Sequence, residues 1–135
     1  MRALIAILLI SVMTPALAEG VVVTSQANTA EISLKDVKKI FLGKKGAYAD
    51  GQKALPVTLI EGDALRAQFN HEVLGKQESQ YIAYWSKMVF TGNSVPPQEV
   101  SNVQEMKDVI AKNPSTVGYI DAALVDDTLR VIGRF

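Results

Sequence analysis

The sequence predicts a single α/β domain in which helices cover a β-sheet. The chain has 135 residues, a length that suits one domain of ordinary size. Short β-branched runs alternate along it with segments whose apolar residues recur at helical spacing, and this alternation is typical of α/β folds. A hydrophobic content of 48% against 21% charged residues excludes an intrinsically disordered chain.

Residues 1–18 have the pattern of a secretory signal peptide. A positive start at Met1-Arg2 precedes an apolar core, and Ala16-Leu17-Ala18 forms a small-x-small cleavage motif. The apolar core is about half of the roughly 20 residues that a spanning helix needs, so a retained membrane anchor is the less favoured alternative. We therefore expect a periplasmic or secreted domain of residues 19–135, with no membrane segment after cleavage.

The first half of this domain is predicted to form a strand, a helix and a second strand. The β-branched run 21–25 is typical of a buried strand. A helix over 33–43 is indicated by apolar residues on one face and by a partial capping box of Ser33 with Asp36. The apolar run 55–60, which follows a turn signal, predicts the second strand.

Two helices are predicted next. Asp63 is expected to be the N-cap of the first, which stops at Gly75. The second covers residues 79–90. The residues of this second helix expected to face inward are Ile82, Trp85 and Val89.

The last part of the chain is predicted to contain one more helix and two closing strands. Pro96-Pro97 requires an extended connector. Ser101 and Gln104 form a capping box at the start of the helix. The runs 117–120 and 129–132 are typical of strands and complete the sheet.

Composition excludes several function classes. Fourteen basic residues balance fourteen acidic ones, so the chain lacks the Lys/Arg surplus of a nucleic-acid-binding protein. It has no cysteine and a single histidine, His71, which excludes thiolate and multi-histidine metal sites; His71 itself is expected to be exposed. No nucleophile-elbow or phosphate-loop motif is present. We expect a protein that is not an enzyme and that uses no cofactor or metal.

A series of modest motifs runs through most of the mature chain. They are 33–43 (SLKDVKKIFLG), Asp50-Gly51, Glu61-Gly62, Leu65-Arg66, Tyr84-Trp85, 90–92 (FTG), Pro96-Pro97 and 117–121 (VGYID). In this order they resemble short exported proteins of the phosphate ABC-importer substrate-binding family. Full-length receptors of that family have two α/β lobes, of the type II periplasmic-binding-protein fold, that close on an oxyanion. The resemblance implies that this chain corresponds to one lobe.

The resemblance also implies where an oxyanion site lies. The strand 55–60 passes into the next helix through Glu61, Gly62 and Asp63, and Arg66 follows one turn later. A helix N-terminus offers free N–H groups and the positive end of the helix dipole. Gly62 matches the family's loop glycine, which lets the backbone approach a ligand closely. These four residues after the strand are the candidate ligand-binding residues.

Three departures from the family pattern predict that this site is degenerate. Asp63 stands where phosphate receptors carry a serine that donates to the ligand. Leu59 stands where they carry an arginine, and Ala64-Leu65 replaces a glycine-threonine pair. A carboxylate at the N-cap satisfies the helix's own N–H groups and repels an anion.

Other polar residues are expected to have ordinary surface roles. Arg66 is expected to be solvated or to pair locally with Glu61 or Asp63, with contact to a bound anion as the alternative. Tyr48, beside a turn, is a weak candidate for exposed recognition. The densest basic cluster is expected to be a solvated helix face, with docking of an acidic partner as the alternative. It consists of Lys35, Lys38, Lys39, Lys44 and Lys45.

Two function classes follow. The first is a solute-binding half-receptor that binds a small oxyanion such as phosphate weakly, or with a protein partner that supplies the second lobe. The second is an interaction module, an adaptor or sensor, that no longer binds phosphate. The family resemblance favours the first class, whereas Leu59 and Asp63 favour the mechanism of the second.

Overall fold

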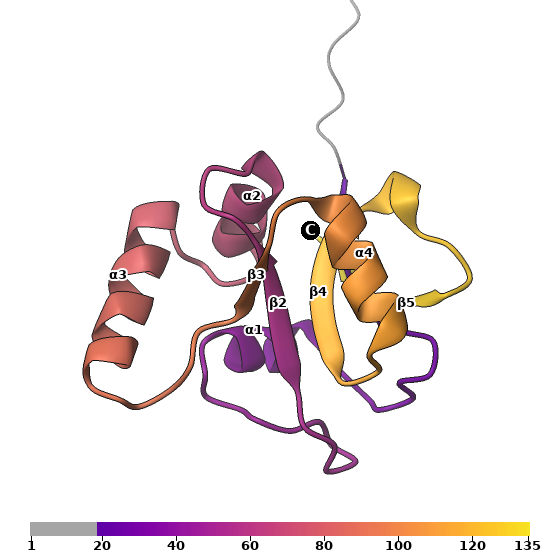
Figure 1. The fold of residues 1–135 in the computed structure, drawn as a ribbon, viewed down its shortest axis with the longest axis horizontal. Coiled ribbons are helices and arrows are strands. Elements are labelled where there is room, and N and C mark those ends of the chain that lie inside the picture. Colours follow the sequence, from indigo (N-terminus) through magenta and orange to yellow (C-terminus); the bar gives the residue numbers. More distant parts are fainter. Residues whose placement is uncertain (1–18) are drawn as a thin grey trace, which may run out of the picture.

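Five strands form one mixed sheet in the computed structural model, which describes residues 19–135 (Figure 1). The strands are β1 (Gly20–Ser25), β2 (Leu55–Leu59), β3 (Gln98–Val100), β4 (Thr116–Asp121) and β5 (Leu129–Arg134). The helices are α1 (Leu34–Phe41), α2 (Ala64–Glu72), α3 (Glu78–Phe90) and α4 (Val103–Lys112), and a short 3-10 helix, η1 (Ala122–Leu124), follows β4. The predicted signal peptide, residues 1–18, lies outside the described residues and stays a prediction.

The sheet has the order β3-β2-β4-β1-β5, and β1 runs against the other four strands. The C-terminal ends of β2, β3, β4 and β5 therefore lie on the same side of the sheet, which we call the carboxyl edge. The register places Gly20 opposite Asp121 and Val21 opposite Arg134, so both ends of the described chain lie at this edge. The predicted α/β fold class is confirmed.

Helices cover both faces of the sheet. Figure 1 shows α4 in front of the sheet and α1 and α2 behind it, with α3 packed outside α2. Met106 and Ile110 of α4 lie on Gly118 of β4, where an added Cβ would come within 2.5 Å of the Met106 sulfur. On the opposite face the ring of Phe69 stacks on Tyr119 with centroids 4.1 Å apart. No helix among residues 19–135 has the length and hydropathy of a membrane span.

The start of α1 confirms the predicted capping box. The Asp36 N–H donates to the Ser33 hydroxyl at 3.1 Å, and the Ser33 N–H donates to the Asp36 carboxylate at 3.0 Å. Lys45 adds an ion pair to the same carboxylate at 2.9 Å. The hydrogen bond from the Ser33 backbone, followed by that from Lys45, lowers the pKa of Asp36 to about 2.

The starts and faces of the later helices differ in part from the prediction. The N-cap of α4 is Asn102, whose side chain accepts the N–H of Glu105, and Ser101 lies one residue outside. Met106 and Ile110 are the buried residues of this helix. In α3 the buried residues are Tyr81 and Trp85, while Ile82 is half-buried and Val89 is exposed. The expectation for Val89 was wrong because α3 packs only along its inner stripe, at the margin of the sheet.

Candidate functional site

A hollow at the carboxyl edge is the candidate ligand site. It has a volume of about 620 Å³ and lies between the N-termini of α2 and α4, beside the end of β4. The carboxyl edge of an open α/β sheet is where such folds commonly bind ligands. The residues lining this hollow are Asp63, Ala64, Leu65, Gln68, Glu72, Asn102, Val103 and Asp121.

The loop that leads from β2 to α2 is shaped by Gly62. This glycine has a φ of +92°, a left-handed conformation that favours glycine, and an added Cβ there would meet no atom within 4 Å. The Ile60 N–H donates to the Val100 carbonyl, which ties the start of the loop to β3. The loop thus leaves open space in front of its backbone, and Glu61 beside it is exposed.

Asp63 occupies the N-terminus of α2, as the sequence predicts. Its carboxylate accepts the N–H of Leu65 at 2.8 Å and that of Arg66 at 3.3 Å. These N–H groups are the donors that an anion would use at a helix N-terminus. In this chain a side chain of the helix itself already holds them.

The N-terminus of α4 is closed in the same way. The Asn102 side chain accepts the Glu105 N–H at 2.9 Å, and the Glu105 carboxylate accepts the Ser101 N–H at 2.9 Å. At α4, therefore, the Asn102 side chain holds one donor of the first helical turn, whereas at α2 the Asp63 carboxylate holds two.

The charge of the hollow is negative. Three carboxylates line it, those of Asp63, Glu72 and Asp121, and no lysine or arginine of the described residues is among its lining. Carboxylates in a concave site lower the local potential and disfavour an anion. Leu59, the last residue of β2, is fully buried and contributes no charge.

Arg66 points away from the hollow. Its side chain is buried, with the residue 2% exposed, and its guanidinium ion-pairs with Glu78 at 2.7 Å and with Glu99 at 3.2 Å. It also donates to the Leu59 carbonyl at 3.0 Å and lies 4.9 Å from the centroid of the Tyr81 ring. The expectation of a solvated arginine, or one paired with the carboxylates of its own helix start, was wrong.

These contacts fix the charge state of Arg66. Burial disfavours the charged guanidinium, but the hydrogen bond and the charge of Glu78 outweigh it, and together they raise the pKa of Arg66. Two carboxylates neutralise the cation, so it joins α2, α3 and β3 and offers little attraction to an anion. No local sequence pattern indicates this cluster, because Glu78 and Glu99 lie 12 and 33 positions further along the chain.

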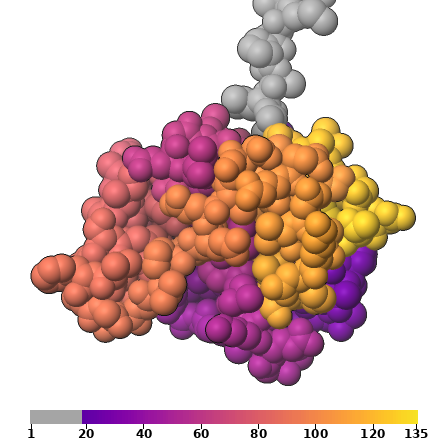
Figure 2. All heavy atoms as spheres, in the orientation of Figure 1, coloured from indigo at the N-terminus to yellow at the C-terminus, as the bar shows by residue number. Residues whose placement is uncertain are grey.

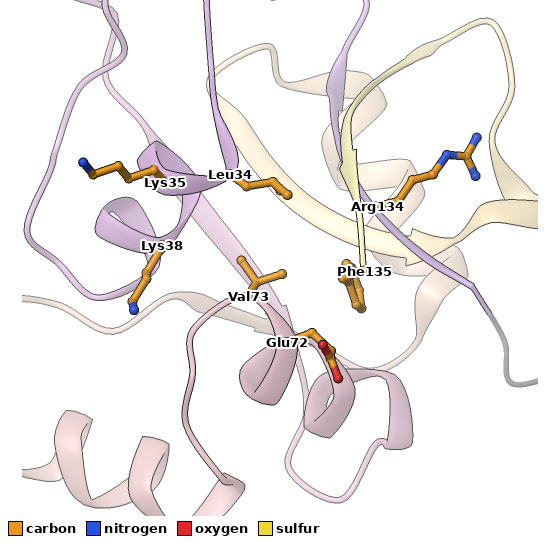
Figure 3. A pocket seen from close by; sticks show the side chains of 7 residues that line it. All are labelled: Leu34, Lys35, Lys38, Glu72, Val73, Arg134 and Phe135. Carbon is orange, nitrogen blue, oxygen red and sulfur yellow. The ribbon is translucent and has the colours of Figure 1, made fainter.

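A second hollow of about 330 Å³ lies between α1, the end of α2 and the end of β5. Figure 3 shows Leu34, Val73 and Phe135 pointing toward one another there, while the side chains of Lys35, Lys38 and Arg134 point outward. The two lysines are exposed, in agreement with a solvated helix face. Docking of an acidic partner on these lysines stays a prediction.

Two further expectations concern single residues. Tyr48 is buried, with 4% exposed, and its hydroxyl donates to the Ser115 carbonyl at 2.6 Å, so the expectation of an exposed recognition residue was wrong. His71 is exposed, as expected, and lies 3.2 Å from the carboxylate of Glu72. Within residues 19–135, no group of three or more His, Asp or Glu side chains is arranged to hold a metal ion.

No protein-family model matches the sequence, and no curated protein matches it significantly. Solved structures do match. A protein from Clostridium perfringens, described as a phosphate ABC transporter substrate-binding protein with bound phosphate, is 20% identical with a TM-score of 0.66. An ABC-type phosphate transport receptor from Vibrio cholerae is 20% identical with a TM-score of 0.64, and PstS from Borrelia burgdorferi is 12% identical with a TM-score of 0.63.

These matches define the class of fold. Each covers 85% of this chain but only 45–47% of the other, so the chain spans about half the length of these structures. At 12–20% identity the likeness shows the fold. The protein thus has the α/β fold of one lobe of phosphate ABC transporter substrate-binding proteins.

Proposed function

We propose that the chain is an exported, periplasmic domain of the solute-binding type, related to the substrate-binding proteins of phosphate importers, with a degenerate oxyanion site. The observation that carries this proposal is the hollow between the N-termini of α2 and α4, in the fold of phosphate-binding proteins. The signal-peptide pattern of residues 1–18 supports the location. The solved structures that match this chain are described as substrate-binding and transport-receptor proteins, which supports a binding role without catalysis.

Four residues are assigned to the proposed site. Gly62 leaves the loop backbone open to a ligand, and Glu61, which precedes it in the same loop, is exposed. Asp63 holds the donors of α2 and must give them up before an anion binds. Arg66 positions the start of α2 through its contact with the Leu59 carbonyl.

A phosphate ion in this hollow meets unfavourable electrostatics. It competes with the Asp63 carboxylate for the α2 N–H groups and faces Glu72 and Asp121. One lobe also leaves one side of a bound ion in water, whereas tight sites bury most of the ligand surface. We therefore expect a dissociation constant in the millimolar range or weaker for the chain alone, that is, no more than about 4 kcal/mol of binding free energy.

A protein partner that supplies the opposite wall is part of the proposal. Both ends of the described chain lie at the carboxyl edge, and the structural neighbours are about twice as long. A second wall that carries basic groups would offset the three carboxylates of the hollow and enclose the ligand.

The second candidate is an interaction module, an adaptor or sensor, that no longer binds phosphate. The capping of α2 by the Asp63 carboxylate, which holds two of the helix's N–H groups, favours it. In this case the carboxyl edge is kept as a protein-binding surface.

Calorimetric titration of the purified protein with phosphate, and with sulfate as a second oxyanion, tests the proposal. Saturable binding in the millimolar range supports a degenerate solute site. Micromolar affinity of the chain alone contradicts the degeneracy. If no heat of binding is observed up to about 50 mM phosphate or sulfate, the interaction module remains as the function, because this concentration is far above the dissociation constant of a working receptor.

A further inference from the structure

The C-terminal end of α3 exposes apolar side chains. Phe90 is 92% exposed, Val95 83% and Val89 54%. We call these three residues the α3 tip. The end of α3 and the loop after it project from the body of the molecule at the left of Figure 2. Single exposed apolar residues are common, but a cluster with a protruding aromatic ring marks an interaction surface.

Two hollows adjoin the α3 tip, one on each side of Pro96. The first, of about 420 Å³, runs along α3 and includes Trp85 and Val89. The second, of about 560 Å³, lies toward the start of β2 and includes Val95 and Leu55. Pro96 lines both. Each is large enough to accept a phenylalanine ring, because a cavity of about 150 Å³ already holds benzene. The same surface therefore carries a protruding ring and receptive hollows.

The charges beside the two hollows have opposite signs. Glu61, Glu99 and the buried Arg66 line the first hollow, and Arg66 pairs with Glu99, so the net charge of this lining is negative. Lys45 and Lys53 line the second hollow. Glu99 and Lys45 have partners within the chain, in Arg66 and Asp36, while Glu61 and Lys53 have no ion pair among the described residues. An apolar centre with an acidic flank and a basic flank is complementary to itself under a two-fold rotation, which is the requirement of an isologous dimer.

We propose that the α3 tip binds the α3 tip of a second copy of this chain, with Phe90 of each copy in a hollow of the other. The acidic flank of one copy then faces the basic flank of its partner. This surface runs along α3 and β3, whereas the hollow of the candidate ligand site lies between α2 and α4, and of the residues assigned to that site it includes Glu61 and Arg66. The occupant is a second copy because the surface supplies both the knob and the hole, with both signs of charge.

Sedimentation equilibrium of the purified protein from about 5 to 500 µM tests this proposal over the affinity range of weak protein interfaces. The expected result is a monomer–dimer equilibrium within that range. Phe90→Ser weakens it at least tenfold, since a buried aromatic anchor dominates such interfaces. Val131→Ser, an exposed valine on β5 away from the α3 tip, leaves it unchanged. Because Phe90 is exposed, Phe90→Ser keeps the fold, which thermal unfolding checks.

A charge exchange provides a second readout. Lys53→Glu and Glu61→Lys each place like charges across the two-fold axis and weaken the dimer, and the two together in one chain restore it. A monomer at all concentrations overturns the proposal, and so does association that Phe90→Ser leaves intact. Binding of the monomer to vesicles of anionic lipid through Phe90 also overturns it and assigns the α3 tip to a membrane surface.

Discussion

The ring of Phe135 lies against the backbone of Gly20, so that a Cβ added to Gly20 would overlap the ring. The Phe135 N–H donates to the Gly20 carbonyl at 2.9 Å. The same ring meets Phe69 edge-on, with centroids 5.5 Å apart, and Tyr119 at 6.1 Å. The last residue of the chain thus closes the aromatic core at the point where the first strand begins.

This contact predicts that Gly20→Ala is destabilising. The new methyl group displaces the Phe135 ring, and we expect the free energy of unfolding to fall by about 1–3 kcal/mol, as for other overpacked cores. Urea unfolding measures the effect. Gly46→Ala is the matched control, because an added Cβ there meets no atom within 4 Å. An equal loss for Gly20→Ala in a Phe135→Ala background would show that the ring contact is not the cause.

The buried position of Arg66 predicts a large loss of stability on Arg66→Met. The substitution leaves the half-buried Glu78 carboxylate without its cation and the buried Leu59 carbonyl without this donor, and we expect a loss of about 2–3 kcal/mol, because water can solvate part of the carboxylate. Arg134→Met is the control, because Arg134 pairs with Glu19 on the surface and such pairs contribute about 1 kcal/mol or less. Chemical denaturation should show a larger loss in the free energy of unfolding for Arg66→Met than for Arg134→Met. Similar losses would contradict the proposed role of Arg66 in holding α2, α3 and β3 together.

The lowered pKa of Asp36 predicts a pH-dependent contribution to stability. Its folded pKa of about 2 is below the value of about 3.9 in an unfolded chain, so the stabilisation is complete above the unfolded value and is lost as the pH falls through the folded one. Asp36→Asn should lower the free energy of unfolding by about 1 kcal/mol at pH 6, a typical loss for a capping interaction. The difference from the unmodified chain should shrink as the pH falls from about 4 to about 2 and vanish below the folded pKa.

Denaturant unfolding between pH 2 and pH 7 checks this prediction. Asp108→Asn serves as the control, since Asp108 is exposed and has no ion pair among the described residues. A difference between Asp36→Asn and the unmodified chain that stays constant over the whole pH range would contradict the assigned role of the carboxylate.

The pattern of residues 1–18 predicts export with cleavage after Ala18. N-terminal sequencing or intact mass of the protein from the periplasmic fraction should give Glu19 as the first residue. Ala18→Arg places a large charged side chain at the cleavage position, where small residues are required, and should cause the precursor to accumulate. A mature protein that retains Met1 would contradict the prediction.

Much of the fold could be predicted because its signals are local. The capping box of Ser33 with Asp36 and the N-cap role of Asp63 involve residues within three positions of each other. The strand β3 could not be recognised, because its three residues follow two prolines, carry no β-branched run and pair with β2 only after the chain has folded. The burial of Tyr48 depends in the same way on Ser115, 67 positions away.

The candidate site was predictable in part. The junction after β2 follows from the rule that ligands gather at the carboxyl ends of strands. Asp121 is the last residue of β4, at the same edge, and could have been found by that rule. The burial of Arg66 could not be predicted from that rule. Helical periodicity does not show which distant carboxylates will pack against a charged residue.

The central claim is that Asp63 closes the N-terminus of α2 to phosphate. Its most direct test follows the amide NMR signals of Leu65 and Arg66 during phosphate titration, at constant ionic strength, in the unmodified chain and in Asp63→Ser. Serine keeps the cap, so stability should change by less than about 1 kcal/mol, and it removes the negative charge. Glu72→Gln is the control, because it removes a carboxylate from the same hollow and leaves the cap intact. We expect saturable, millimolar binding in Asp63→Ser that is at least several times tighter than in the unmodified chain and in Glu72→Gln. Equal affinity in all three proteins, or no phosphate binding by Asp63→Ser at tens of millimolar, would contradict it.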